Sequence, residues 1–169
     1  MTTDPHAARD SRDFRDALGH FGTGVAVITT RDEDGRPYGL TATSFNSVSL
    51  DPPLILWSQG RQAPSHPVFL RAQRFVVNVL AAEQRELGHH FARHSEDKFR
   101  GVPVTSADHG LPVLAGAAAH FVCTTESCVE GGDHCVFIAR VVDYTHRHDA
   151  QPLFFWRGRM LAPPPQAMV

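Results

Sequence analysis

The sequence predicts a mainly β protein: a closed antiparallel β-barrel with a few short helices. Three observations lead to this fold class. About seven short apolar runs have the character of strands, the helical segments are few and short, and most connections suit hairpins. Parallel neighbours need crossover connections of a dozen or more residues, which most of the gaps cannot supply. We therefore expect a barrel and not a doubly wound parallel sheet.

The first expected element is a short N-terminal helix. Ser11 is a suitable N-cap, and Phe14, Leu18 and Phe21 share one face at helical spacing. Gly22 can end the helix, because glycine accepts the left-handed conformation common at helix ends. This segment therefore offers one apolar face.

Four strands are expected before residue 81. Asp34-Gly35 suits positive φ and is the strongest hairpin signal in the chain. The Asp51-Pro52-Pro53 sequence is a second break. The expected strands are Val25–Thr30, buried on both faces, then Tyr38–Ser44, Leu54–Trp57 and Phe75–Leu80.

The remaining elements follow the same rules. Pro64–Arg71 and Glu83–His94 are expected helices, the second with Leu87 and Phe91 facing inward. A loop rich in Gly, Pro and Ser runs from about Ser95 to Gly110. The expected strands here are Ala118–Val129 and His134–His146, around a turn at residues 130–133, and finally Leu153–Trp156.

Composition limits the classes of partner and compartment. The 169 residues include 16 Lys and Arg against 18 Asp and Glu, a formal charge of −2, so no basic field exists for nucleic acid or an anionic membrane. No apolar run approaches the ~20 residues of a spanning helix. Cys123, Cys128 and Cys135 are odd in number and lack CxxC spacing, which favours a reduced, cytoplasmic protein. We expect one domain, residues 11–161, between a disordered leader (1–10) and a tail (162–169).

The common catalytic and nucleotide motifs are absent. The chain has no GxGxxG after a strand, no GxxxxGK[ST], no GxSxG and no HExxH. His90 and His94 have a spacing that allows shared ligation, and His89, His109 or Cys135 could add a ligand. The surrounding carboxylates and cysteines do not have the spacing of zinc sites, so we expect no metal site.

Three stretches remain as candidate binding segments. Residues 41–49 are rich in small hydroxyl side chains, which would let a flat ligand approach the backbone. Residues 58–65 precede a helix and offer Arg61 and Ser65 to a phosphate. Residues 132–134 place His134 beside an apolar strand face. Each has an ordinary alternative: a solvated edge strand, a surface loop and a structural histidine, respectively.

Together these stretches resemble the flavin reductase-like family, the small NAD(P)H:flavin oxidoreductases with an FMN-binding split barrel. The resemblance runs in order from about Phe14 to Met160. Its most specific part is the long hydroxyl-rich motif with a GDH motif downstream. The motifs are FGTGVAVITT (21–30), GLTATSFNSVSLDPPL (39–54), FVVNVL (75–80), Phe91-Ala92, Lys98-Phe99-x-Gly101, GDH (132–134) and PLFFWRG (152–158).

The resemblance implies a six-stranded antiparallel Greek-key split barrel that works as a homodimer, with flavin near the subunit interface. It also implies roles for individual residues. Thr41, Ala42, Thr43 and Ser44 would line the isoalloxazine edge, mostly through backbone. Ser58, Gln59, Arg61 and Ser65 would hold ribityl and phosphate, and Lys98 and Phe99 would close over the ring. His134 would meet the nicotinamide, with Gly132 and Asp133 shaping its turn.

The implied activity is hydride transfer from NADH or NADPH to FMN or FAD, with the reduced flavin supplied to a separate monooxygenase. Such transfer needs stacking and orientation, so His134 is expected to orient the nicotinamide and not to donate a proton. Arg93, Arg100 and Arg157 are candidates for the 2′-phosphate of NADPH. Two alternatives stay open: a flavoprotein with a dedicated ferric or corrinoid acceptor, and a non-enzymatic protein that binds flavin, haem or metal.

Overall fold

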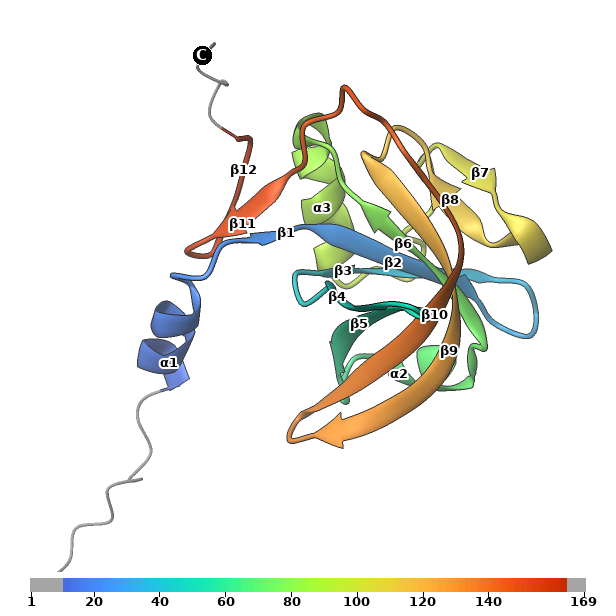
Figure 1. Ribbon diagram of the computed structural model, residues 1–169, viewed down its shortest axis with the longest axis horizontal. Coiled ribbons are helices and arrows are strands. Elements are labelled where there is room, and N and C mark those ends of the chain that lie inside the picture. The colour runs from blue at the N-terminus through green and yellow to red at the C-terminus, as the bar shows by residue number, and fades with distance from the viewer. Residues whose placement is uncertain (1–10, 164–169) are drawn as a thin grey trace, which may run out of the picture.

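The structure is a computed structural model that describes residues 11–163. The expected leader (1–10) and all but the first two residues of the expected tail lie outside the described residues. The described chain is mainly β: a seven-stranded antiparallel sheet curls into a barrel, and a small three-stranded sheet projects from it with one helix (Figure 1). The prediction of a mainly β barrel with few, short helices is confirmed.

The barrel strands run in the order β3-β2-β6-β9-β10-β5-β4. Their bounds are β2 Ala26–Arg31, β3 Pro37–Ala42, β4 Asn46–Leu50, β5 Pro53–Gly60, β6 Arg74–Val79, β9 Ala119–Gly131 and β10 His134–His146. The sheet has one strand more than the expected six, because the hydroxyl-rich stretch does not continue as one strand. It turns at residues 43–45 and returns as β4, which pairs with β5. Ser, Thr and Asn fit turns as well as strands, so local pattern could not separate the two.

Between β6 and β9, the elements depart from expectation in two places. The expected helix at residues 83–94 is a 3₁₀ turn, η1 (Ala82–Gln84), followed by α3 (Arg85–Ala92). The expected loop at 95–110 contains a strand, β7 (Val104–Ser106), and a 3₁₀ turn, η2 (Asp108–Gly110), before β8 (Pro112–Leu114), with which β7 pairs. These strands have three residues each, too few to show a period of two. Helix α2 is His66–Arg71.

Strand β2 is buried on both faces, as predicted. Its alternate residues enter two different clusters: Ala26 and Ile28 face the barrel interior, and Val27 faces an outer cluster. The hairpin to β3 turns at Asp34-Gly35 as predicted, and Gly35 has a φ of 80°. Asp32 Oδ1 accepts from the backbone amides of Asp34 and Arg36, which fixes the turn.

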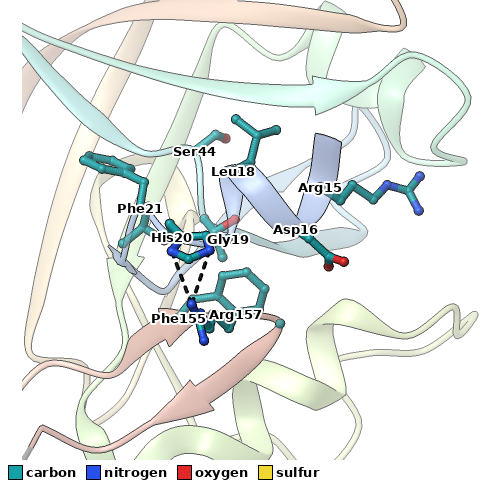
Figure 2. A pocket seen from close by; sticks show the side chains of 12 residues that line it. Arg15, Asp16, Leu18, Gly19, His20, Phe21, Ser44, Phe155 and Arg157 are labelled. Carbon is teal, nitrogen blue, oxygen red and sulfur yellow. Dashed lines mark hydrogen bonds between the residues drawn. The ribbon is translucent and has the colours of Figure 1, made fainter. Parts of the chain in front are cut away.

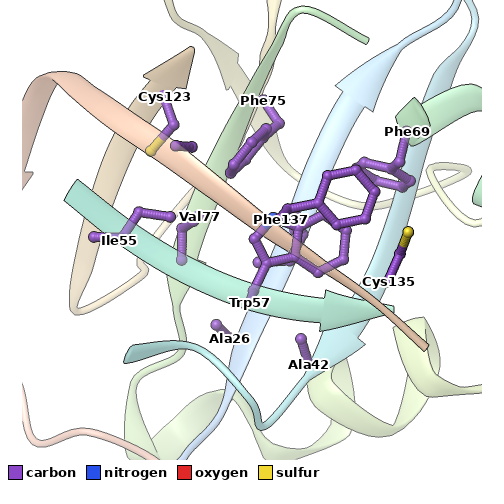
Figure 3. Packing of buried hydrophobic residues seen from close by; sticks show 12 residues of the cluster. Ala26, Ala42, Ile55, Trp57, Phe69, Phe75, Val77, Cys123, Cys135 and Phe137 are labelled. Carbon is purple, nitrogen blue, oxygen red and sulfur yellow. The ribbon is translucent and has the colours of Figure 1, made fainter. Parts of the chain in front are cut away.

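Aromatic rings fill the barrel interior (Figure 3). Trp57 on β5 stacks on Phe137 of β10 with ring centroids 4.6 Å apart. Phe69 of α2 and Phe75 of β6 present edges to the same indole. All four side chains are almost completely buried, so this cluster joins α2 to three barrel strands.

A second apolar cluster covers the outside of β2. Phe91 of α3 packs there with Val27, Leu80 and Leu153. Gly39 on β3 makes this packing possible, because a Cβ at that position would stand 2.7 Å from the Phe91 ring. The sequence thus places α3 against β3 and leaves no space for a side chain between them.

Asn78 is a polar junction inside this apolar wall. Its side-chain amide donates to Val27 O and to Thr29 Oγ1, both at 3.0 Å, and its Oδ1 accepts from Leu114 N at 2.9 Å. The residue is fully buried, so each of these groups would otherwise lack a partner. Asn78 therefore holds β8 against β2 and β6.

The segments outside the barrel come from both ends of the described chain. We call residues 11–24 and 154–161 the arm. They contain α1 (Ser11–Leu18), β1 (Thr23–Gly24), β11 (Phe154–Trp156) and β12 (Arg159–Leu161), and the strands β1-β11-β12 form one sheet. Figure 1 shows α1 and this sheet projecting from one side of the barrel. Helix α1 ends at Leu18, earlier than Gly22. The face of Phe14, Leu18 and Phe21 that the spacing predicts is exposed.

Candidate functional site

Two of the three candidate segments are joined by a side-chain clamp. Ser44 Oγ accepts from Ser58 N at 2.8 Å and donates to Ser58 O at 3.2 Å. The Ser44 side chain thus bonds the backbone of β5 as a neighbouring strand would, at a point beyond the end of β3. The hydroxyl-rich turn and the start of the 58–65 segment therefore lie side by side.

The third segment reaches the same region through strand pairing. His134 is the first residue of β10 and pairs with Gly60 at the end of β5. A Cβ at Gly60 would stand 3.8 Å from His134 Nε2, so the imidazole lies over this glycine. The fold therefore brings together three segments that are far apart in the sequence.

The turn before β10 places His134 in contact with the side chain of the neighbouring Asp133. Gly132 has a φ of 61°, which lets the β9–β10 hairpin turn tightly. Asp133 Oδ1 lies 2.7 Å from His134 Nδ1, and this contact lowers the pKa of the exposed Asp133 carboxyl. Arg61 N donates to Asp133 O, and its guanidinium lies 3.4 Å from Glu130. With Nδ1 engaged, Nε2 is the imidazole atom free to meet a ligand.

A cavity of about 930 Å³ lies between the hydroxyl-rich turn and the arm (Figure 2). This volume suits a cofactor-sized ligand. The barrel contributes Thr43 and Ser44 to its lining. The arm contributes His20, Phe21, Thr23, Phe155 and Arg157.

The cavity lining contains a polar atom that has no partner. Thr23 Oγ1 is buried without a hydrogen bond, one of two such side-chain atoms within residues 11–163. A buried hydroxyl of this kind is costly unless something bonds it. In the same lining, the Arg157 guanidinium donates to the His20 ring, 3.2 Å from Nε2 (Figure 2). The lining therefore offers hydrogen-bonding groups and a cation next to aromatic rings, which fits a flavin with its phosphate.

Several expected contact residues already have partners inside the protein. Thr41 Oγ1 donates to Gly88 O at 2.7 Å, which leaves backbone as the means of ligand contact there. Gln59 is buried: its amide nitrogen donates to Ser65 Oγ, and its Oε1 lies 3.1 Å from His66 Nδ1. The expected ribityl or phosphate contact of the Gln59 side chain is therefore not available in this arrangement.

Lys98 and Phe99 lie against Gly39 of β3 and Phe91 of α3, and neither lines the larger cavity. Lys98 Nζ donates to Phe91 O at 2.8 Å and to Gly39 O at 3.2 Å, and burial lowers the pKa of this ammonium. Phe99 packs its ring against the edge of Phe91. Lys98 and Ser65 also line a second cavity of about 250 Å³. The structure thus places Lys98 and Ser65 together, apart from the larger cavity.

Of the histidines weighed as metal ligands, His90 has another partner. His90 Nε2 lies 2.7 Å from Lys98 O and so anchors the loop after α3. Residues 11–163 contain no group of three or more His, Cys, Asp or Glu side chains arranged to hold a metal ion. Over the same residues, no helix has the length and apolar character needed to cross a membrane.

Sequence reasoning missed the contribution of the arm to the cavity. Thr23 and Phe155 lie in two of the family motifs and His20 in none, but nothing local indicates that these turns and short strands meet around a cavity. Arg157 was considered only for the phosphate of NADPH, and it lies in the lining. Its φ of 48° in a non-glycine residue is a feature that only the backbone shows.

Comparison with known proteins gives a consistent result. Residues 18–162 match the family described as "Flavin reductase like domain". The chain is 42% identical over 149 residues to an NADH-dependent FMN reductase of Agrobacterium fabrum, covering 88% of this chain and 84% of that protein. It is 40% identical over 157 residues to the reductase component of a trigonelline monooxygenase of Acinetobacter baylyi. That match covers 93% of this chain and only half of the longer relative.

A solved structure agrees with these relatives. The NADH:FAD oxidoreductase of Streptomyces globisporus, in complex with NAD and FAD fragments, superposes with a TM-score of 0.89 at 38% identity, over 99% of both chains. Family match, relatives and fold all cover nearly the whole chain. The protein therefore belongs to the flavin reductase-like family.

Proposed function

We propose that this protein is an NAD(P)H:flavin oxidoreductase that supplies reduced FMN or FAD to a separate monooxygenase. The observation that carries the proposal is the cavity of about 930 Å³, bordered by the hydroxyl-rich turn of the family motif and containing the unpaired Thr23 hydroxyl. Flavin supplies the redox chemistry, since it accepts the hydride of a reduced nicotinamide. The protein has to bind, orient and exclude water.

Each candidate segment has a distinct task in this proposal. The backbone of Thr41, Ala42 and Thr43 lines the flavin ring edge, and Ser44 holds this turn against Ser58. His134, oriented by Asp133, directs Nε2 to the nicotinamide carboxamide. Arg61, Ser65, Lys98 and Phe99 remain candidates for phosphate and ring contacts, whereas Gln59 positions Ser65 and His66.

The first test is cofactor turnover by the purified full chain. NADH and NADPH oxidation is measured with FMN, with FAD and without added flavin. We expect oxidation that depends on added flavin, and the fastest pair identifies the substrates. Oxidation that no flavin accelerates would contradict the proposal. The NADH-dependent relatives in Agrobacterium and Streptomyces support NADH as the first donor to test.

The role of His134 has a matched control on its own strand. His134 and His146 stand at opposite ends of β10, so His146→Ala makes the same chemical change far from the turn. We expect His134→Ala to lower kcat/KM for NADH about tenfold, equivalent to roughly 1.4 kcal/mol. Flavin affinity, measured by fluorescence quenching, should be nearly unchanged. Equal loss of flavin affinity would show that the nicotinamide assignment is wrong.

We further propose a cytoplasmic homodimer whose interface covers the arm. The exposed apolar side chains Phe14, Leu18, Phe21, Phe154 and Trp156 support it, because such groups on one projecting element mark an interaction surface. A twofold dimer is the commonest way to cover such a surface with a second copy. The three unbonded cysteines are in keeping with a reducing compartment. Sedimentation velocity at micromolar concentration tests the dimer, and a purely monomeric chain would contradict it.

A further inference from the structure

Two of the three cysteines meet across the β9–β10 hairpin. Cys128 Sγ lies 2.6 Å from Cys135 Sγ, only slightly beyond the length of a disulfide bond, about 2.05 Å. Both groups are free thiols in this structure. Neither is part of the flavin or nicotinamide site described above.

Strand register explains why the two side chains meet. Cys128 pairs with Phe137, and Cys135 lies two residues before Phe137 on β10. Opposite residues share a sheet face, and so do residues two apart, so both thiols point to the face that carries Phe137. The two cysteines thus form a diagonal cross-strand pair close to the turn of the β9–β10 hairpin.

The surroundings allow an oxidant to reach one sulfur and protect the other. Cys128 is half-buried, whereas Cys135 is almost completely buried within the aromatic core. Burial raises the pKa of the Cys128 thiol to about 12, and its hydrogen bond to Cys135 adds to this. Cys128 therefore rests as a protonated thiol at neutral pH, which makes its reaction with an oxidant slower than that of a thiolate.

We propose that Cys128 and Cys135 are a site of reversible oxidation that forms an intrachain disulfide across the β9–β10 hairpin, with a hydroperoxide as oxidant. Hydrogen peroxide oxidises the Cys128 sulfur to a sulfenic acid and releases one water. The Cys135 sulfur then forms the S–S bond as the S–O bond breaks, and its proton leaves with hydroxide as a second water. Two thiols are oxidised by two electrons, and one peroxide is reduced to two waters.

The third cysteine is a built-in control. Cys123 lies five residues before Cys128 on β9, roughly 16 Å along the strand at 3.3 Å per residue. It is completely buried, and its Sγ contacts Phe121 O. Its distance from both other sulfurs exceeds the reach of a disulfide. Oxidation should therefore leave Cys123 as a free thiol.

The test is thiol counting on the full chain before and after peroxide. The reduced protein should give three alkylated cysteines after denaturation, and the oxidised protein one, with an intact mass lower by the two hydrogens removed. Cleavage after glutamate separates the three sites, because Glu126 and Glu130 lie between them. We expect peptide 127–130 bound to the peptide that starts at Gly131, and dithiothreitol should release it.

Single variants make the result independent of any one substitution. Cys128→Ser and Cys135→Ser should each keep both remaining thiols after peroxide, while Cys123→Ala should keep none. Circular dichroism checks that each variant is folded, and Cys128→Ser at the half-buried position is the mildest change. Three alkylated cysteines after oxidation, a bond that includes Cys123, or a bond between two chains would each overturn the proposal.

Discussion

The barrel and the arm are both rich in aromatic residues, but the barrel buries its aromatic rings and the arm leaves most of its rings exposed. Inside the barrel, Trp57 and Phe137 stack and are at most 1% exposed. On the arm, Phe14 and Phe21 are 60% and 75% exposed. Alternate side chains of each barrel strand point inward, so that rings from several segments pack together in one closed interior. The arm has one eight-residue helix and strands of two or three residues, with no second layer.

This difference indicates where the free energy of each region comes from. Burial of a large apolar side chain contributes about 1.5–3 kcal/mol, and the barrel obtains this within one chain. In the arm, Met160 and Phe155 pack against the outer cluster, but the exposed aromatic side chains gain burial only when something else covers them. Variants in the barrel should therefore change unfolding, and variants in the arm should change association.

The largest effect should follow removal of the central barrel ring. Trp57→Ala deletes the indole against which Phe137, Phe69 and Phe75 pack. We expect the free energy of unfolding to fall by about 3–5 kcal/mol, because transfer and cavity costs add. Chemical denaturation followed by circular dichroism measures it. The exposed Leu70 of α2 supplies the control, since Leu70→Ala should stay within about 0.5 kcal/mol.

The next effect concerns the polar junction in the barrel wall. Asn78→Leu keeps the side-chain size but leaves Leu114 N and Thr29 Oγ1 without their amide partner. We expect a loss of about 2 kcal/mol, the cost of unpaired buried polar groups. The same denaturation experiment applies. Asn46→Leu, at an exposed amide, should have little effect, and equal losses for the two variants would contradict the role of Asn78.

A substitution on the arm should leave the barrel intact and weaken self-association. Phe21→Asp places a charge on the exposed apolar surface, so we expect the dimer dissociation constant to rise at least tenfold, about 1.4 kcal/mol. Sedimentation velocity over a concentration series measures it, and denaturation of dilute protein should show no change. Leu70→Asp puts the same charge on an exposed apolar position of α2. If it dissociates the dimer equally, the interface is not on the arm.

The smallest effect should come from the ring contact inside the arm. The Arg157 guanidinium lies 5.0 Å from the centroid of the Trp156 ring, and such a contact at an exposed site contributes about 0.5–1 kcal/mol. Arg157→Ala should therefore lower stability by no more than this. Arg159→Ala, two residues away on β12, removes the same charge without that contact. A loss of several kcal/mol for Arg157→Ala would mean that the arm is stabilised within one chain after all.

Sequence reasoning succeeded where the pattern was long or the turn chemistry specific. The two-sided burial of β2, the Asp34-Gly35 hairpin and the two long strands of the β9–β10 hairpin all follow from local pattern. It failed at residues 43–50, where small hydroxyl residues suit both a strand and a turn, and at β7 and β8, which are too short for a period to appear. The site residues stay predictions, and in the structure the Gln59 side chain bonds internally to Ser65 and His66.

The sequence by itself determined the barrel class, most of its strands and the family of flavin reductases, because these depend on alternation, turn residues and motif order along the chain. Only the tertiary structure decided which segments meet: the clamp of Ser44 on Ser58, the approach of Cys128 to Cys135, and the cavity between barrel and arm. The physical reason is that these contacts depend on strand register and on the packing of segments far apart in sequence. No local pattern encodes either of them.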